Sequence, residues 1–460
     1  MTYYDFLSQK SVLPKPHGFK PGVLLPKLFD WQKAVTKFSI KIGRAGNFED
    51  CGLGKTAQQI AWAQQVYQHT GAPVLILAPL AVAPQTKREG DKFGVPVNIA
   101  ETAEDIVPGI NVTNYEKLDK FDTSIFSGVV LDESSILKAY TGKVKRAIVR
   151  KFSDTRYRLS CSATPAPNDL MELLNQAEFL GIMKSSEALS CWFIADQSNA
   201  GRYRLKGHAE KDFWRWVASW AVCISKPSDI GYSDNGYILP KLTENDVTVR
   251  APEEQNIFLA CREKPDMSAT GFHREKRKTL KQRAEKCAEI ANSTDEQCVI
   301  WCYQNDEADA LKKLLPNAVE IRGSDTAKAK ESAALRFIQG DVQTLISKPS
   351  IFGYGLNFQN CRNCIFCGLD YSYESYYQAV RRFYRFGQPL PVRVWRVIGE
   401  NEKQILETIN RKARMKSNMG RSMADAMRDV QIENLRGRQF KLSLQKQHAD
   451  IPDWLRSEAS

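Results

Sequence analysis

The fold of the first half of the chain is decided by the stretch Glu49-Asp-Cys-Gly-Leu-Gly-Lys-Thr56. Gly52 and Gly54 leave room for backbone N–H groups to approach an anion closely. Lys55 can reach the terminal phosphates of a nucleotide, and the Thr56 hydroxyl can hold Mg²⁺. We therefore predict a phosphate-binding loop here.

The surroundings of this loop favour a parallel α/β sheet. The residues after Thr56 are good helix formers, as such a loop requires, although Glu49 replaces the first glycine of the usual eight-residue pattern. The residues before the loop, Arg44-Ala-Gly-Asn-Phe48, have little strand character. In contrast, Val74–Ala78 and Val129–Leu131 are continuously apolar, which is typical of strands buried on both faces.

Two carboxylates, Asp132 and Glu133, follow directly on the apolar run that ends at Leu131. Sheets of this kind present ligand-binding groups at the carboxyl ends of their strands. Asp132 would hold Mg²⁺ through water, and Glu133 would orient or deprotonate an attacking water. The alternative interpretation is an acidic turn after a buried strand.

A second informative stretch is Gln378-Ala-Val-Arg-Arg-Phe-Tyr-Arg-Phe-Gly-Gln388. If it is helical, Arg382 and Arg385 share one face and Arg381 points elsewhere. Two aligned arginines suit an active site that closes between domains, where arginine stabilises the charge of the transition state in phosphoryl transfer.

The order of patterns along the chain predicts two α/β units. Strand patterns return at Val299–Trp301, Thr344–Ile346 and Ile365–Phe366, with helical patterns between them. The predicted parts are an N-terminal arm (1–27), a first domain (28–180), a helical insertion or linker (181–295), a second domain (296–400) and a basic helical extension (401–460).

Taken together, the motifs resemble those of helicase superfamily two, and within it the Swi/Snf-type DNA translocases, in a compact bacterial or phage form. The resemblance runs from about Leu28 to about Ile398. The segments that carry it, in chain order, are Leu28–Gln32, Asp50–Thr56, Ala78–Leu80, Val112–Tyr115, Asp132–Ser135, Leu159–Pro165, Asn168–Leu170, Gly323–Ser324, Gly353–Asn357 and Gln378–Gln388. Arg-Phe-Gly-Gln at the end of the last segment is close to the Arg-Ile-Gly-Gln of the Swi/Snf type. The chain departs from the family at Cys51, at Ser134-Ser135 and at Tyr371.

The resemblance implies an α/β fold of two tandem RecA-like parallel-sheet domains with helical insertions and a basic helical C-terminal extension. ATP and Mg²⁺ would bind between the domains and DNA across them. Gln32 would contact the adenine, while 78–80 and 112–115 would contact the DNA backbone. Four residues would couple the nucleotide state to the grip on DNA: Ser162, Thr164, Gly355 and Gln378.

The implied function is a DNA-dependent ATPase that translocates on duplex DNA. A strand-separating DNA or RNA helicase remains an alternative within the enzymes. A different class of function is an ATP-gated DNA-binding clamp, or the motor subunit of a restriction-type complex.

The composition of the 460-residue chain is that of a globular protein, with 43% hydrophobic and 26% charged residues. A net charge of +12 favours a polyanionic partner. The longest apolar run, Val74–Ala83, is too short to span a bilayer, and the N-terminus lacks the pattern of a signal peptide. Eleven scattered cysteines favour a reducing cytoplasm, that of a bacterial cell or a phage-infected host.

Three further patterns have a structural and a functional interpretation. The spacing Cys361-x-x-Cys364-x-x-Cys367 could ligate a metal, but we favour thiols packed on a core strand. Trp214, Trp216 and Trp220 are expected in the core rather than as a stacking platform for bases. The segment 411–446 contains ten Lys or Arg and only three acidic residues. Either a solvated helix face or a surface that binds phosphates along the DNA would explain this excess of positive charge.

Overall fold

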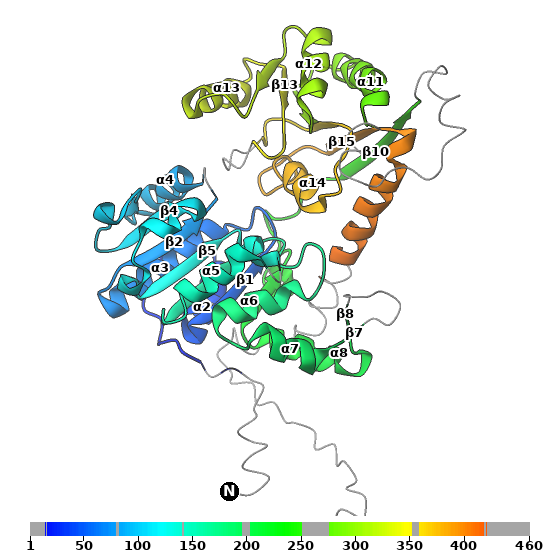
Figure 1. The fold of residues 1–460 in the computed structure, drawn as a ribbon. Helices are drawn as coiled ribbons and strands as arrows, with labels where there is room; N and C mark the ends of the chain where they lie inside the picture. Colours follow the sequence, from blue (N-terminus) through cyan, green and yellow to red (C-terminus); the bar gives the residue numbers. More distant parts are fainter. Residues whose placement is uncertain are drawn as a thin grey trace, which may run out of the picture.

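The computed structural model describes residues 14, 16–79, 82–139, 142–195, 203–250, 276–351, 358–417 and 420. Within them the chain forms two parallel sheets, each with helices on both faces, joined by short crossings (Figure 1). Four predicted segments lie wholly or partly outside these residues: the N-terminal arm, the segment 78–80, the segment 353–357 and most of the basic extension.

The first sheet has seven parallel strands in the order β3-β4-β2-β5-β6-β1-β9. Their bounds are β1 Arg44–Glu49, β2 Val74–Ala78, β3 Val97–Ile99, β4 Ile110–Asn114, β5 Gly128–Asp132, β6 Tyr157–Cys161 and β9 Ala221–Ile224. The two strands predicted from apolar runs, β2 and β5, lie next to each other in this sheet, and every residue of both is buried.

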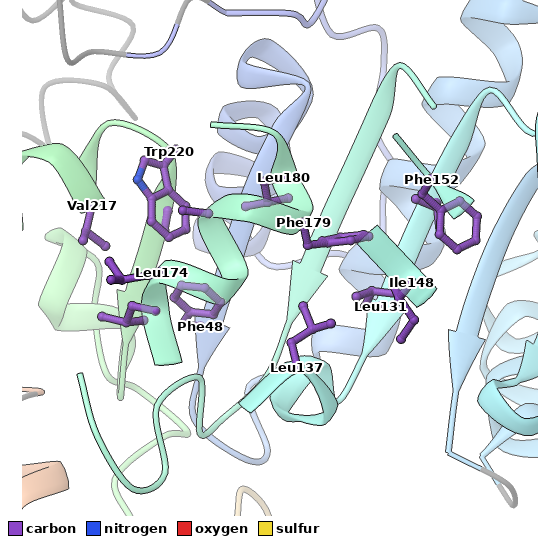
Figure 2. Close-up of a cluster of buried hydrophobic side chains, with 14 of the residues drawn as sticks. Phe48, Leu131, Leu137, Ile148, Phe152, Leu174, Phe179, Leu180, Val217 and Trp220 are labelled. Atoms are coloured by element: carbon purple, nitrogen blue, oxygen red, sulfur yellow. The ribbon is translucent and has the colours of Figure 1, made fainter. Parts of the chain in front are cut away.

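Helices cover both faces of this sheet. They are α2 Asp30–Ile42, α3 Lys55–Thr70, α4 Ala83–Phe93, α5 Lys143–Lys151, α6 Glu172–Leu180, α7 Ser185–Trp192 and α8 Glu210–Ala218. One face packs against α5, α6 and α8, where Phe48, Ile148 and Trp220 belong to a single buried cluster (Figure 2). The other packs against α2, α3 and α4. Burial of each large side chain in these clusters stabilises the fold by about 2 kcal/mol.

Strand β1 shows how tertiary packing can outweigh a weak strand signal. It lies between β6 and β9, and five of its six residues are buried. Gly46 is required here, because a β-carbon at this position would lie 2.7 Å from the Phe48 ring and 3.1 Å from Ala221. The phosphate loop therefore follows a strand that is paired on both sides, with β6 and with β9.

The second sheet has six parallel strands in the order β10-β15-β14-β11-β13-β12. Their bounds are β10 Leu242–Val249, β11 Cys298–Cys302, β12 Val319–Ile321, β13 Thr344–Ser347, β14 Asn363–Cys367 and β15 Val392–Gly399. Helices α11 Leu280–Asn292 and α12 Asn305–Leu314 cover one face, and α13 Ala327–Gln339 and α14 Tyr373–Val380 the other. The strands predicted around 300, 345 and 365 are thereby confirmed.

A fully buried charge network holds the helical side of the second domain together. Arg283 on α11 bonds Glu307 on α12, with 2.6 Å between Nη1 and the carboxylate, and its Nε lies 3.3 Å from Glu402. The ammonium of Lys276 lies 3.6 Å from Glu307 and 3.7 Å from Glu402. All four side chains are at most 2% exposed. The network ties both helices to the end of β15.

The predicted α/β architecture of two tandem parallel-sheet domains is confirmed, but residues 181–295 are not a helical insertion. They include the hairpin of β7 Phe193–Ala195 and β8 Tyr203–Leu205, and they contribute β9 to the first sheet and β10 and α11 to the second. The difference arises because β9 is a four-residue strand, too short to recognise behind the aromatic helix α8. The chain crosses between the sheets at residues 225–241.

The tryptophans considered as a base-stacking platform and the cysteines considered as metal ligands lie in hydrophobic cores. Trp214, Trp216 and Trp220 are at most 2% exposed, which confirms the core assignment. Cys364 and Cys367 are on β14 and fully buried. In the described part of the chain no group of three or more potential ligands is arranged to hold a metal ion, and no helix there is long and apolar enough to cross a membrane.

Candidate nucleotide-binding and catalytic site

The phosphate loop connects the end of β1 to the start of α3. Gly52 and Gly54 have φ angles of 90° and 80°, a conformation that favours glycine. Substitution would also meet neighbours, since a β-carbon at Gly54 would lie 2.5 Å from the amide nitrogen of Gln32. Because α3 begins at Lys55, its first N–H groups and its positive dipole end face the loop, which suits an anion.

Lys55 is held at the centre of this loop. Its ammonium donates to the carbonyl oxygens of Glu49, at 2.8 Å, and Asp50, at 3.2 Å. Burial acts to lower the pKa of Lys55, but the surrounding anionic groups, including Glu133, raise it above its usual value. The side chain is thus a fixed cation that an incoming phosphate can engage.

Asp132 ends β5 next to the loop. Its Oδ1 accepts a hydrogen bond from Gln59 on α3 at 2.8 Å, and its carbonyl oxygen accepts one from the Tyr115 hydroxyl at 2.7 Å. Burial raises the pKa of Asp132 above its usual value. Thr56 lines the same cavity, so a hydroxyl and a carboxylate, both oxygen donors that Mg²⁺ prefers, are available together.

Glu133 follows Asp132 and has an unusual backbone. Its φ of 54° makes it the one non-glycine residue with a left-handed conformation in the ranges that the structure describes. Burial raises the pKa of its carboxyl to about 7. The carboxylate accepts a hydrogen bond from the Ser162 hydroxyl at 3.4 Å, and Ser162 accepts one from the Thr164 amide at 3.0 Å. The two predicted coupling residues of the first domain therefore lie directly behind Glu133.

The second domain contributes arginines to the same cavity, but from a turn rather than a helix. Helix α14 ends at Val380, so the prediction that Arg382 and Arg385 share a helical face is wrong. The chain leaves the helix because the Arg382 carbonyl accepts from Phe358 at 3.0 Å and Gly387 adopts a φ of 88°. Both arginines nevertheless line the cavity. Burial, and then the neighbouring Arg385, lowers the pKa of Arg382 to about 10.

The helical interpretation predicted that Arg381 points away from Arg382 and Arg385. This prediction is wrong, because Arg381 lines the same cavity. Its guanidinium is paired with the Asp50 carboxylate of the phosphate loop, and its Nε lies 3.0 Å from the Tyr377 hydroxyl. Asp50 and Arg381 are 331 residues apart, so no local sequence pattern could have predicted that they form an ion pair.

These groups surround one cavity of about 550 Å³ between the two domains. The first domain supplies most of its walls and the second supplies four residues from α14 and the turn after it. The lining residues are Cys51, Gly52, Gly54, Lys55, Thr56, Pro79, Val82, Gln85, Tyr115, Glu116, Asp132, Glu133, Ser135, Ile136, Lys138, Gln378, Arg381, Arg382 and Arg385. Ligand sites commonly occupy cavities of this size at domain interfaces.

Among the predicted residues that the structure describes, Gln32, Ser162 and Thr164 do not line the cavity. Gln32 is buried, and its amide nitrogen donates to the Leu53 carbonyl at 2.9 Å while its oxygen accepts from the Phe29 amide at 3.0 Å. It thus braces the phosphate loop from behind. Gly355 lies outside the described residues, as do the flanking residues 353, 354 and 357.

Sequence reasoning did not identify Gln59 and Tyr115 as site residues. Gln59 follows Thr56 by three positions on α3, so helical spacing could have placed both on the same face. Tyr115 ends a segment expected to contact the DNA backbone, whereas the structure places it against Asp132 in the cavity. Its role depends on the neighbouring β5, which a one-dimensional pattern does not show.

Residues 278–387 match the helicase conserved C-terminal domain family. The match therefore includes α14 and the three arginines that reach the cavity from the second domain. The match ends at Gly387, one residue before the end of the arginine-containing stretch Gln378–Gln388.

Segments of the chain are similar to several known proteins. The chain is 28% identical to the ISWI chromatin-remodeling complex ATPase CHR11 of Arabidopsis thaliana, over 39% of this chain and 19% of that protein. It is 29% identical to the DNA annealing helicase and endonuclease ZRANB3 of Mus musculus, over 35% of this chain and 17% of that protein. It is 27% identical to protein p41 of Acyrthosiphon pisum secondary endosymbiont phage 1, over 33% of this chain and 38% of that protein. The matches thus span less than a fifth of the two longer relatives.

Among solved structures, the Sulfolobus solfataricus SWI2/SNF2 ATPase core in complex with dsDNA aligns with a TM-score of 0.42 and 18% identity. The alignment covers 91% of this chain and 98% of that one. The fold assignment rests on the two parallel sheets described above.

Proposed function

We propose that this protein is a DNA-dependent ATPase that translocates on duplex DNA, driven by ATP hydrolysis between its two domains. The observation that carries the proposal is the single cavity in which a phosphate loop and an Asp-Glu pair of one domain face three arginines of the other. A site completed by both domains changes when they move, so hydrolysis and domain movement are linked.

In this proposal the triphosphate lies on the loop, where Lys55 leaves the Glu49 and Asp50 carbonyl oxygens to bind it. Thr56 and Asp132 would hold Mg²⁺, which neutralises charge on the phosphates when bound. Glu133 orients the attacking water and accepts its proton, and a carboxyl pKa near 7 suits a base at neutral pH. Arg382 and Arg385 stabilise the charge that develops on the transferred phosphoryl group.

The coupling to DNA is assigned to residues next to these groups. Ser162 bonds both Glu133 and the Thr164 amide, so a change at the catalytic carboxylate reaches the segment after β6. Gln378 lines the cavity from the second domain. We propose Gly355 as a further coupling residue. We also propose that Gln32 contacts the adenine, for which the Gln32 amide would have to break its hydrogen bond to the Leu53 carbonyl and bond the base instead.

DNA as the partner is supported by the charge and by the relatives. The net charge of +12 attracts phosphate backbones, and one relative is named as a DNA annealing helicase. We place the protein in the cytoplasm of a bacterial cell or phage-infected host, since the ten described cysteines are free thiols and one relative is from a phage.

The first test measures ATP hydrolysis with duplex DNA, single-stranded DNA and RNA in parallel. We expect the largest stimulation with duplex DNA. Displacement of a triplex-forming strand without unwinding of a forked duplex would support translocation. Efficient fork unwinding without triplex displacement would instead indicate a strand-separating helicase, and DNA binding gated by ATP without turnover would indicate a clamp.

A further inference from the structure

The carboxylate of Asp50, two residues before Gly52 in the phosphate loop, is surrounded by groups from the second domain and the helical residues 403–417. The Arg381 guanidinium and the Tyr377 hydroxyl both bond it. The Lys416 ammonium lies 3.5 Å from its Oδ1 and 3.2 Å from the centre of the Tyr377 ring. One carboxylate of the first domain thus meets three groups from the other side of the cleft.

This cluster is shielded from solvent. The side chains of Asp50, Arg381 and Lys416 are 11%, 15% and 23% exposed. Ion pairs at such sites are screened less by salt than pairs on the surface, and removal of one partner leaves the other charge poorly solvated. Salt therefore screens this contact less than the exposed pair between Arg88 on α4 and Glu331 on α13, which also joins the two domains, at 3.5 Å.

The arginine-bearing turn is fixed at its other end by aromatic packing. The Phe386 ring lies 4.7 Å from that of Tyr237, which itself packs on Trp31 of α2 at 5.6 Å. A β-carbon at Gly52 would be 3.1 Å from the Phe386 amide nitrogen, so the turn lies directly on the phosphate loop. Arg382 and Arg385 lie between the two anchored residues.

We propose that Asp50 is a positioning residue, which binds Arg381 and thereby holds Arg382 and Arg385 over the phosphate loop. The inference rests on the proposed ATP hydrolysis for its kinetic consequence, but the pairing itself does not. Asp50 contacts no reacting group through its side chain. Its effect on turnover must pass through the arginines that follow its partner.

The kinetic test compares Asp50→Ala, Asp50→Glu and Glu331→Ala in the full-length chain, with Mg²⁺, ATP and duplex DNA. We expect Asp50→Ala to lower kcat about tenfold while KM for ATP changes by less than about twofold, because the loop that binds phosphate is intact. Asp50→Glu should recover most of kcat, since it keeps the charge. Glu331→Ala, the matched control, removes an interdomain carboxylate without touching the cavity and should leave kcat unchanged.

A double-mutant comparison separates positioning from a general structural effect. In an Arg382→Ala, Arg385→Ala background, Asp50→Ala should have no further effect on kcat, because the groups it positions are absent. A full tenfold loss in that background would overturn the proposal, as would an unchanged kcat in Asp50→Ala alone.

Hydrogen exchange of the nucleotide-free protein decides the pairing without reference to hydrolysis. Peptides covering 381–388 should exchange faster in Asp50→Ala than in wild type, should be largely restored in Asp50→Glu, and should be unchanged in Glu331→Ala. Equal exchange in Asp50→Ala and wild type would overturn the inference. If wild-type protein hydrolyses no ATP, the proposed function fails, while the exchange result still decides whether Asp50 holds this turn.

Discussion

At the scale of single residues, the backbone of Glu133 is the most unusual in the site. A left-handed conformation costs a non-glycine residue about 1 kcal/mol or more, so surrounding structure must hold it. Here Asp132 is fixed by Gln59 and Tyr115, and Ser162 bonds the Glu133 carboxylate. The strained turn directs the carboxylate into the cavity that also contains Lys55, where a water-orienting base is needed.

We expect Lys55→Ala and Glu133→Gln each to reduce DNA-stimulated ATP turnover by at least about 10²-fold, through loss of the phosphate contact and of the base respectively. Glu133→Gln should still bind ATP, because the loop is unchanged. Steady-state hydrolysis and calorimetric ATP binding measure the two effects. The exposed Glu187→Gln on α7 serves as a control for loss of a carboxylate, and full turnover in both site variants would contradict the proposed roles.

We expect Arg382→Ala and Arg385→Ala to slow turnover by up to about 10³-fold while ATP affinity is nearly retained, because arginine acts mainly on the transition state. Single-turnover hydrolysis at saturating ATP gives the rate, and equilibrium binding gives the affinity. A variant that lost ATP affinity but kept its turnover at saturation would show that its arginine binds the ground state instead.

At the scale of elements, sequence reasoning was reliable where one feature dominated and failed where distant packing decided. Continuous apolar runs predicted β2 and β5, because strands buried on both faces need no alternation. Strand β1 gave little signal, since its support comes from β6 and β9 on either side. The helix predicted through Arg385 ends at Val380, because a bond to Phe358 draws the chain into a turn.

The candidate site follows the same division. The loop and the Asp-Glu pair could be predicted, since each is contiguous and its chemistry depends on local order. The contact of Asp50 with Arg381 could not, because opposite charges are common along the chain and only the closed arrangement of domains selects these two.

The end of β1 gives a pH-dependent prediction. Glu49 is fully buried, and burial raises the pKa of its carboxyl from 4.5 to about 7. Because this pKa is higher in the folded protein than in the unfolded chain, the Glu49 carboxyl adds most to the free energy of unfolding below pH 4.5, where it is protonated. That contribution is lost as the pH rises through 7. We therefore expect Glu49→Gln to gain stability relative to wild type across this interval, by up to about 3 kcal/mol. Denaturant unfolding at pH 5 and pH 8 measures it, and a difference independent of pH would contradict the prediction.

The buried charge network of the second domain gives a stability prediction. Glu307→Ala should destabilise this domain by about 3 kcal/mol, because it leaves Arg283 and Lys276 as buried charges with half of their acidic partners. The matched control is Asp306→Ala, which breaks the exposed pair with Arg277 and should change stability by less than about 0.5 kcal/mol. Thermal unfolding of both variants provides the comparison, and equal effects would contradict the assigned role of burial.

At the scale of the whole molecule, the helical residues 403–417 leave the second sheet and return to the first domain (orange in Figure 1). Lys412 donates to the Asn168 side chain there at 3.1 Å. Asn168 follows the segment that contains Ser162 and Thr164. Within the described residues, this helix therefore brings Lys412 next to the proposed coupling segment.

We expect removal of residues 418–460 to weaken DNA affinity and to flatten its dependence on salt, because six Lys or Arg between 421 and 446 would no longer meet phosphates. Binding isotherms at several salt concentrations measure the slope. Replacement of Lys281 and Lys286 on α11 by Gln provides a control for loss of positive charge. An unchanged slope after the truncation would indicate that the segment is a solvated face.

The crossing at residues 225–241 joins β9 of one sheet directly to β10 of the other. Fully extended, a segment of this length reaches at most about 60 Å, so the two halves of the nucleotide site never diffuse apart. A short covalent tether of this kind gives the arginines an effective concentration on the order of millimolar at the phosphate loop. The proposed catalytic arginines are thus supplied by the same chain, and a single copy can complete its site at any dilution.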